Sequence, residues 1–156
     1  MEPAALQQLI AKWWFNYDEG RFDVLRELLT ADAHFSSRSD TGATHYEEFI
    51  RADVRGRDEV MAWQTDHRRN SPYPLRHNGT NVHLVDARDG RGDEATFESY
   101  IFVTQIVDGN PSNLSSGICR GAVRVEDGTL RICAFEVVLD TMTSALFSQV
   151  KGEVRG

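Results

Sequence analysis

The feature that most constrains the fold is the order of its residue patterns: helix-forming segments come first, and a long series of strand-forming segments follows. Turn-like residues separate the β-forming segments at 88–92, 108–111 and 127–128, and the last pair, Asp127-Gly128, is a strong two-residue hairpin signal. This pattern predicts an antiparallel meander of four strands rich in Val, Ile, Phe, Tyr and Thr: Leu75–Asp86, Ala95–Val107, Ser115–Glu126 and Thr129–Leu139.

The N-terminal part of the chain has helical periodicity. Residues 3–17 carry Leu, Ile, Trp and Tyr at steps of three and four, which predicts a helix with one broad apolar face. Gly20 ends that helix, and a second short amphipathic helix is expected from Phe22 to about Asp32. A third helix is expected over 57–67, with apolar and polar residues on one side: Val60, Trp63, Gln64 and His67.

The remaining segments have weaker patterns. Residues 33–37 are expected to form a short strand, residues 39–57 mostly a loop, and residues 141–150 a short terminal helix. We expect a single domain over 1–150 and a flexible tail over 151–156. Helices followed by antiparallel strands indicate an α+β fold, and a strongly bent sheet around the helices would enclose a pocket for a small molecule.

Composition excludes several classes of function. The chain has 156 residues and a net charge of −7, which argues against a broad nucleic-acid surface. Its densest basic pair, Arg68-Arg69, is interpreted as a solvated helix end. We expect neither a signal peptide nor a membrane-spanning stretch, and with only two cysteines we expect a cytoplasmic protein with reduced thiols. The histidines lack ligand spacing, so we expect neither metal nor cofactor.

Two polar residues far apart in the chain carry the strongest chemical signal. Asp18 lies at the flank of the apolar face of the first helix, and His77 opens the first long strand. A buried Asp can orient an imidazole and offset its charge, so that the pair moves protons without a cofactor. The alternatives are that Asp18 caps the second helix and that His77 is a surface or core residue.

Further candidates line the same expected pocket. Asn81 could hold a substrate oxygen or satisfy backbone groups at a bulge, and regular alternation places it on the face of His77, with a possible bulge at Gly79. Arg120 needs an anion if it points inward, and it meets solvent or a second copy if it points outward. A share of the aromatic residues is expected to form the wall: Trp14, Tyr17, Phe35, Trp63 and Tyr100.

The chain resembles the SnoaL-like branch of the NTF2-like superfamily, which includes scytalone dehydratase and hexachlorocyclohexane dehydrochlorinase. The resemblance rests on three runs in order: Tyr17-Asp18 followed by Leu25, Leu28-Leu29, Asp32 and Phe35; His77 with Thr80-Asn81-Val82; and the hairpin from Val123 to Ile132. It implies a cone-shaped barrel with the N-terminal helices packed in a strongly bent, mostly antiparallel sheet.

The resemblance also implies roles for residues. Asp18 and His77 match the catalytic Asp–His pair of the two named enzymes, and Tyr17 matches a substrate-contacting tyrosine of the dehydratase. This chain has Phe35-Ser36-Ser37 where the dehydratase has a second tyrosine, and no histidine matches its other catalytic one. The resemblance therefore favours a dehydratase, isomerase or polyketide-cyclase type of reaction on a hydrophobic small molecule, but not scytalone dehydration.

A second resemblance leads to a different expectation. The β subunits of aromatic-ring-hydroxylating dioxygenases share a pattern with Arg76-His77, Asn81-Val82 and the run from Leu130 to Asp140. A β-subunit-like structural partner and a small-molecule binder without turnover therefore remain alternatives. We expect a homodimer through the open face of the sheet, with neither nucleic acid nor membrane as a partner.

Overall fold

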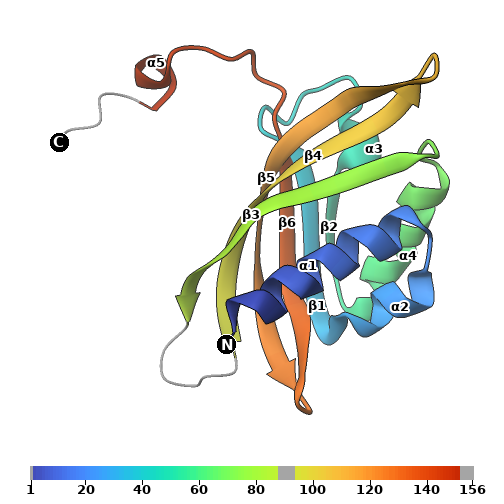
Figure 1. The fold of residues 1–156 in the computed structure, drawn as a ribbon, viewed down its shortest axis with the longest axis vertical. Helices are drawn as coiled ribbons and strands as arrows, with labels where there is room; N and C mark the ends of the chain where they lie inside the picture. Colours follow the sequence, from blue (N-terminus) through green and yellow to red (C-terminus); the bar gives the residue numbers. More distant parts are fainter. Residues whose placement is uncertain (1, 88–93, 152–156) are drawn as a thin grey trace.

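The protein is a curled sheet with helices packed against one face (Figure 1). The computed structural model describes residues 2–87 and 94–151. Its elements in chain order are α1 (Pro3–Asp18), α2 (Phe22–Glu27), β1 (Leu29–Ser39), α3 (Glu47–Ile50), β2 (Ala52–Arg55), α4 (Arg57–Arg69), β3 (Leu75–Ala87), β4 (Glu94–Val107), β5 (Asn110–Glu126), β6 (Thr129–Leu139) and α5 (Phe147–Lys151). The expected α+β class is confirmed.

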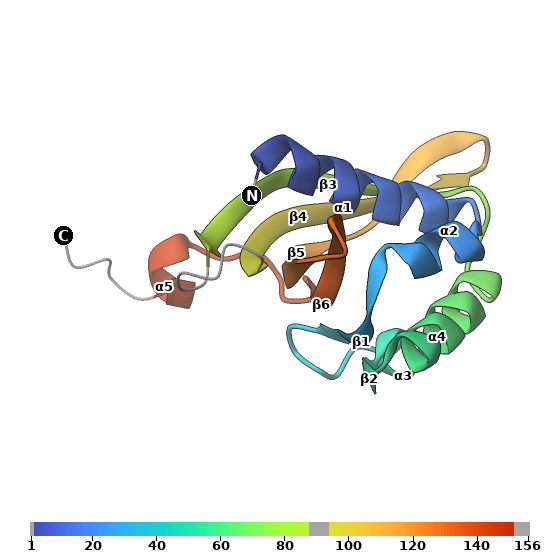
Figure 2. The same cartoon turned by 90° about the horizontal axis from the view of Figure 1, so that it is seen from below.

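The six strands form one sheet in the order β2-β1-β6-β5-β4-β3. All neighbours are antiparallel except β1 and β6, which run parallel. The predicted hairpin joins β5 to β6, and both Asp127 and Gly128 have positive φ, as this type of tight turn requires. The sheet curls strongly (Figure 2), but among the described strands it is not closed, because β2 and β3 are its two edges.

The helices fill the concave face of the sheet. The indole of Trp13 in α1 meets Phe135 of β6 edge-on at 5.6 Å between ring centres, and Trp63 of α4 packs on Phe35 of β1 at 5.1 Å. Helix α1 also crosses the edge strand β3 closely, because a Cβ built at Gly79 would lie only 3.0 Å from the Trp14 ring. One continuous apolar core therefore connects both long helices to the sheet.

The structure corrects the prediction for the segment after α1. Helix α2 ends at Glu27 rather than near Asp32, and β1 begins at Leu29, so the strand is longer than the expected 33–37. Buried and more exposed residues alternate along most of β1, and its outer positions are polar, which hides the strand in a search for apolar runs. The expected loop over 39–57 contains the short elements α3 and β2.

The two ends of the predicted β region also differ from expectation. Strand β5 starts at Asn110 rather than Ser115, which extends its pairing with β4. Helix α5 begins only at Phe147, buries no residue, and lies apart from the body of the domain (Figure 1). The predicted turn at 88–92 and the tail from residue 152 onward lie outside the described residues.

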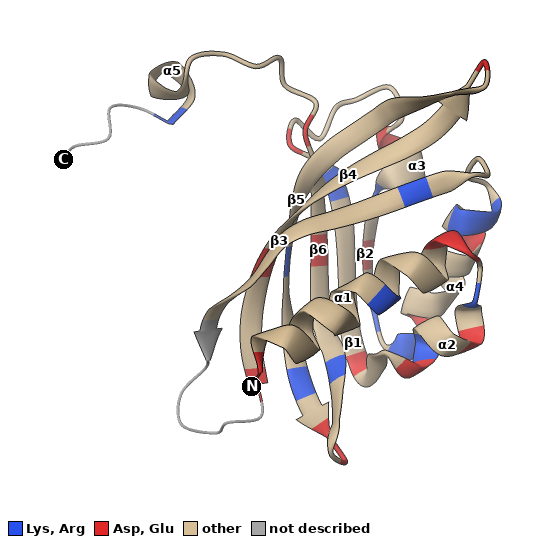
Figure 3. Ribbon diagram, viewed as in Figure 1, with Lys and Arg blue, Asp and Glu red and all other residues tan. Residues whose placement is uncertain are grey.

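Charged residues of both signs are interspersed over the described part of the chain. Both α2 and α4 carry acidic and basic residues, and residues of both signs recur on the strands (Figure 3). None of the helices within 2–87 and 94–151 is long and apolar enough to cross a membrane. The thiols of Cys119 and Cys133 are free.

Candidate functional site

The end of α1 and the start of β3 bring Asp18 and His77 together. Nδ1 of His77 lies 2.5 Å from Oδ1 of Asp18, and the backbone N–H of His77 donates to Oδ2 at 2.8 Å. The two side chains are only 6% and 10% exposed. A carboxylate can only accept, so His77 carries its proton on Nδ1 and leaves the lone pair of Nε2 unused by any described residue.

Aromatic rings of α1 fix the orientation of this imidazole. Trp14 stacks on His77 at 4.8 Å with an angle of 4° between the planes, and Tyr17 meets the same ring edge-on at 5.1 Å. Trp14, Tyr17 and Asp18 are three and four residues apart on one helix, so one turn of α1 supplies all three contacts. Rotation of the imidazole is therefore restricted on its face, its edge and its Nδ1 side.

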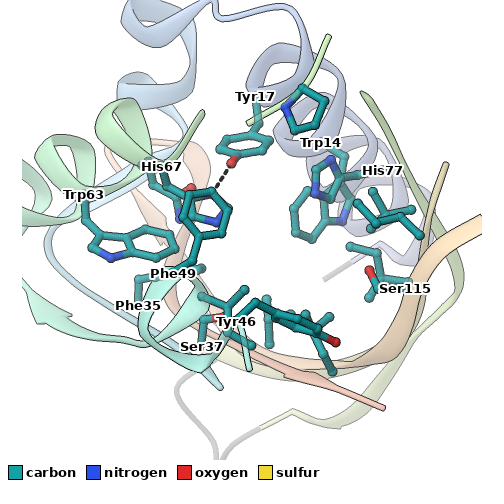
Figure 4. A pocket seen from close by; sticks show the side chains of 18 of the residues that line it. Trp14, Tyr17, Phe35, Ser37, Tyr46, Phe49, Trp63, His67, His77 and Ser115 are labelled. Atoms are coloured by element: carbon teal, nitrogen blue, oxygen red, sulfur yellow. Dashed lines mark hydrogen bonds between the residues drawn. The ribbon is translucent and has the colours of Figure 1, made fainter. Parts of the chain in front are cut away.

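A second histidine, His67 near the end of α4, pairs with Tyr17. The phenol oxygen lies 2.5 Å from Nδ1 of His67 (Figure 4). Burial raises the pKa of Tyr17 above its usual range, and burial, followed by electrostatic interactions with His77 and Arg68, lowers the pKa of His67 to about 4. At neutral pH the phenol therefore donates, Nδ1 accepts, and the remaining imidazole proton lies on Nε2.

His67 was not predicted as a site residue. The sequence does hold a weak signal, since the predicted helix places His67 on the same side as Val60 and Trp63. In the structure Trp63 stacks on His67 at 4.6 Å and Phe49 covers it at 4.4 Å. Its Nε2 is buried without a hydrogen-bond partner among the described residues. The sequence comparison found no histidine that matches the other catalytic one of the dehydratase, and it did not point to His67.

Tyr17, His67 and His77 line one apolar cavity of about 330 Å³ (Figure 4), whereas Asp18 is not among its lining residues. The predicted residues Trp14, Tyr17, Phe35, Trp63 and His77 all lie on its wall. Of the described residues that line it, none is Asp, Glu, Lys or Arg. The polar side chains besides the site groups are Ser37, Tyr46, Gln64, Gln105 and Ser115. The cavity therefore suits an uncharged, largely apolar molecule with a few oxygen atoms.

Three predicted residues lie away from this cavity: Asn81, Tyr100 and Arg120 line a separate hollow on the outer face of the sheet. Tyr100 is 56% exposed, and Arg120 forms an ion pair with Glu98 at 2.9 Å across two strands. The bulge lies at Asn81 and not at Gly79.

The register of β3 explains the position of Asn81. Thr80 is opposite Tyr100 and His83 is opposite Glu98, so two residues of β3 face one of β4, and Asn81 has φ of 57°. This extra residue shifts the alternation and turns the rest of the strand over. Asn81 therefore occupies a backbone position that Asn tolerates better than most residues.

A curled sheet lined by helices, with an apolar cavity between them, defines the class of this α+β domain. A family model described as a SnoaL-like domain matches residues 2–136. The chain belongs to this family. No match was found among curated proteins.

Solved structures share the fold at low sequence identity. A candidate scytalone dehydratase from Novosphingobium aromaticivorans has a TM-score of 0.68 and 15% identity, with 90% of this chain and 85% of that chain covered. The β subunit of a candidate aromatic-ring-hydroxylating dioxygenase from the same organism has a TM-score of 0.69 and 16% identity, with 91% of each chain covered. ActVI-ORFA from Streptomyces coelicolor has a TM-score of 0.68 and 20% identity, with 87% and 95% covered. These similarities show the fold, which two further solved structures with TM-scores of 0.68 and 0.66 describe as cystatin-like and, in one case, as that of an NTF2-like protein.

Proposed function

We propose that this protein is a cofactor-independent acid–base enzyme of the dehydratase, isomerase or cyclase type, acting on a hydrophobic small molecule. One observation carries the proposal: two imidazoles line one apolar cavity, and Nδ1 of each meets a different partner, a carboxylate for His77 and a phenol for His67. Asp18 fixes the proton of His77 on Nδ1, and Tyr17 fixes the proton of His67 on Nε2. One ring therefore offers a lone pair and the other a proton.

His77 is the proposed general base. Its Nε2 would take a proton from a carbon next to a carbonyl group, and the Asp18 carboxylate would offset the positive charge that forms. The carboxylate also holds the imidazole in the tautomer that exposes Nε2. General acid–base groups placed in this way contribute roughly 10²–10⁴-fold to a rate.

His67 and Tyr17 form the proposed acid side. The Nε2–H of His67 would donate a hydrogen bond to a substrate oxygen that gains charge, and the Tyr17 hydroxyl would hold this tautomer by donating to Nδ1. In a dehydration, a β-hydroxyl of the substrate would leave as water with the proton that His77 has taken. In an isomerisation, His77 would return that proton to another carbon. The role first expected for Asn81 passes to this pair.

The wall of the cavity favours ring-containing substrates. Trp14, Phe35 and Trp63 present flat apolar surfaces, and the described lining includes no charged side chain to bind a carboxylate or an amine. A water-poor cavity also strengthens the electrostatic contacts that form as charge develops. An uncharged aromatic or polycyclic ketone or alcohol fits these conditions best.

One alternative is a structural role of the β-subunit type, which the likeness to a dioxygenase β subunit over 91% of each chain favours. Such a subunit needs an outer surface for its partner but no paired histidines inside. That role would be favoured if the protein co-purified with an iron–sulfur protein and if His77→Ala changed the turnover of no small molecule tested.

The test is proton exchange on a simple probe. We would incubate the protein with β-tetralone, a bicyclic aromatic ketone, in deuterated buffer and follow loss of the α protons by NMR. The wild type should accelerate exchange, and His77→Ala should lose most of that acceleration while its melting temperature changes little. His83→Ala is the matched control, because His83 lies on the outer face of the same strand. Equal rates for His77→Ala and the wild type would contradict the proposal.

A further inference from the structure

Arg68, in the last turn of α4, is a buried cation that the proposed proton transfers do not use. Only 6% of the residue is exposed. Its Nε and Nη2 both donate to the backbone carbonyl of Asp18, at 3.1 and 2.9 Å, and its Nη1 donates to the carbonyl of Pro72 at 3.0 Å. Among the described residues no carboxylate forms an ion pair with it. The interpretation of Arg68 as part of a solvated helix end is therefore wrong, although the neighbouring Arg69 is exposed.

The acceptors of Arg68 belong to the segments that carry the site. Asp18 is the last residue of α1, which supplies one member of each pair, and Pro72 lies in the connection that leads to β3 and His77. Arg68 itself follows His67 in sequence. A single guanidinium thus joins the ends of α1 and α4 to the entry of β3, using a helix-terminal carbonyl that the helix itself leaves free.

The planar shape of the guanidinium matters for these contacts. Two N–H groups on one edge reach the same carbonyl, while a third reaches Pro72 in another direction. The group also lies between two aromatic rings, 6.0 Å from the ring centre of Tyr17 and 5.7 Å from that of Tyr73. An ammonium group on a flexible stem could carry the charge but could not span both carbonyls in the same way.

We propose that Arg68 is a positioning residue of the site: the N–H donors of its guanidinium hold the Asp18–His77 pair and the Tyr17–His67 pair in position beside the cavity. The catalytic consequence of this role rests on the proposed function, whereas the geometric role does not. Without these hydrogen bonds, the end of α1 and the segment that leads into β3 would no longer be joined near the contact of Asp18 with His77.

The charge of Arg68 adds a second effect on the same pair. Behind burial and the electrostatic interaction with His77, Arg68 is a further cause that lowers the pKa of His67, and Asp66 acts in the opposite direction. The titratable or charged groups that face His67 are Tyr17 from α1, His77 from β3, and Asp66 and Arg68 from α4. Charge and shape are therefore separable by substitution.

The experiment uses the free full-length protein and two NMR signals. One is the hydrogen-bonded Nδ1 proton of His77, which reports the contact with Asp18, and the other is the pH titration of His67. We would compare Arg68→Met and Arg68→Lys with Arg69→Met, which removes the same charge from the next, exposed position of α4. A folded amide spectrum is checked for each variant.

The proposal predicts a different result for each variant. Arg68→Met should lose the His77 signal and raise the pKa of His67 toward that of a free histidine. Arg68→Lys should keep the pKa of His67 low but weaken the His77 signal, and Arg69→Met should change neither. A wild-type His77 signal in both Arg68 variants, or in Arg68→Lys alone if Arg68→Met does not fold, would overturn the positioning role. Because no substrate is needed, this outcome is independent of whether turnover of any probe is found.

Discussion

Tyr17 and Asp18 are neighbours in sequence, yet their side chains reach different histidines. The last turn of α1 sends the phenol toward α4 and the carboxylate toward β3. Each contact fixes the proton of one imidazole, so the chemistry of two rings depends on two adjacent residues. The sequence could show Asp18 and His77 as a pair by resemblance, but it could not show Tyr17–His67, because that contact depends on how α4 packs against α1.

Removal of the carboxylate should abolish most of the activity without unfolding the protein. In Asp18→Asn the amide cannot hold the His77 proton on Nδ1 as a carboxylate does, so exchange on β-tetralone should fall by about 100-fold or more. The matched control is Asp53→Asn, which breaks an exposed His34–Asp53 pair at 2.7 Å outside the cavity. An equal loss in both variants would show that the assay does not report the buried pair.

Burial of neutral His67 predicts an acid-sensitive fold. Its folded pKa is about 4, against 6.5 for the free side chain, so between these values the unfolded chain binds more protons. The free energy of unfolding should be highest above pH 6.5 and should fall by up to about 3 kcal/mol as the pH drops to 4.

Urea unfolding at several pH values measures this effect. The variant His67→Gln keeps an acceptor for the Tyr17 hydroxyl but cannot be protonated, so its stability should depend less steeply on pH over the same interval. Parallel curves for the variant and the wild type would mean that His67 is not buried in its neutral form.

At the scale of elements, local pattern gave the long helices and strands but not their pairing. The apolar periodicity of residues 3–17 and 57–67 corresponds to α1 and α4, and Asp127-Gly128 makes the expected turn. The parallel contact of β1 with β6 joins segments about a hundred residues apart, and no local signal specifies it. The bulge at Asn81 likewise depends on pairing with β4, so regular alternation placed that residue on the wrong face.

The crossing of α1 over β3 gives a test of this packing. In Gly79→Ala the new methyl group would lie 3.0 Å from Cδ1 of Trp14, the ring that stacks on His77. We expect a loss of about 1–3 kcal/mol in stability and a slower exchange reaction, because the indole must move. The substitution His83→Ala, at an exposed position of the same strand, should leave both quantities almost unchanged. A fully active, stable Gly79→Ala protein would contradict the close packing.

At the scale of the molecule, the described helices that pack on the sheet cover its concave face. The convex face carries the aromatic residues Tyr100 and Phe102, which are 56% and 40% exposed, beside Ile118 on the next strand. We propose that this face joins two copies of the chain. The double variant Tyr100→Glu/Phe102→Glu should then have half the solution mass of the wild type by light scattering. Phe15→Glu, at a 57% exposed position of α1, is the control, and a wild-type mass in the double variant would exclude this interface.

The tautomers of the two buried histidines test the central claim most directly. We would record ¹⁵N spectra of the free protein at neutral pH, with the rings assigned by His67→Gln and His77→Ala. The account predicts that both imidazole rings are neutral, with the proton of His77 on Nδ1 and the proton of His67 on Nε2. If both rings carry the proton on the same nitrogen, or if His67 is fully charged at pH 7, the site cannot offer a base and an acid together, and the proposed mechanism is wrong.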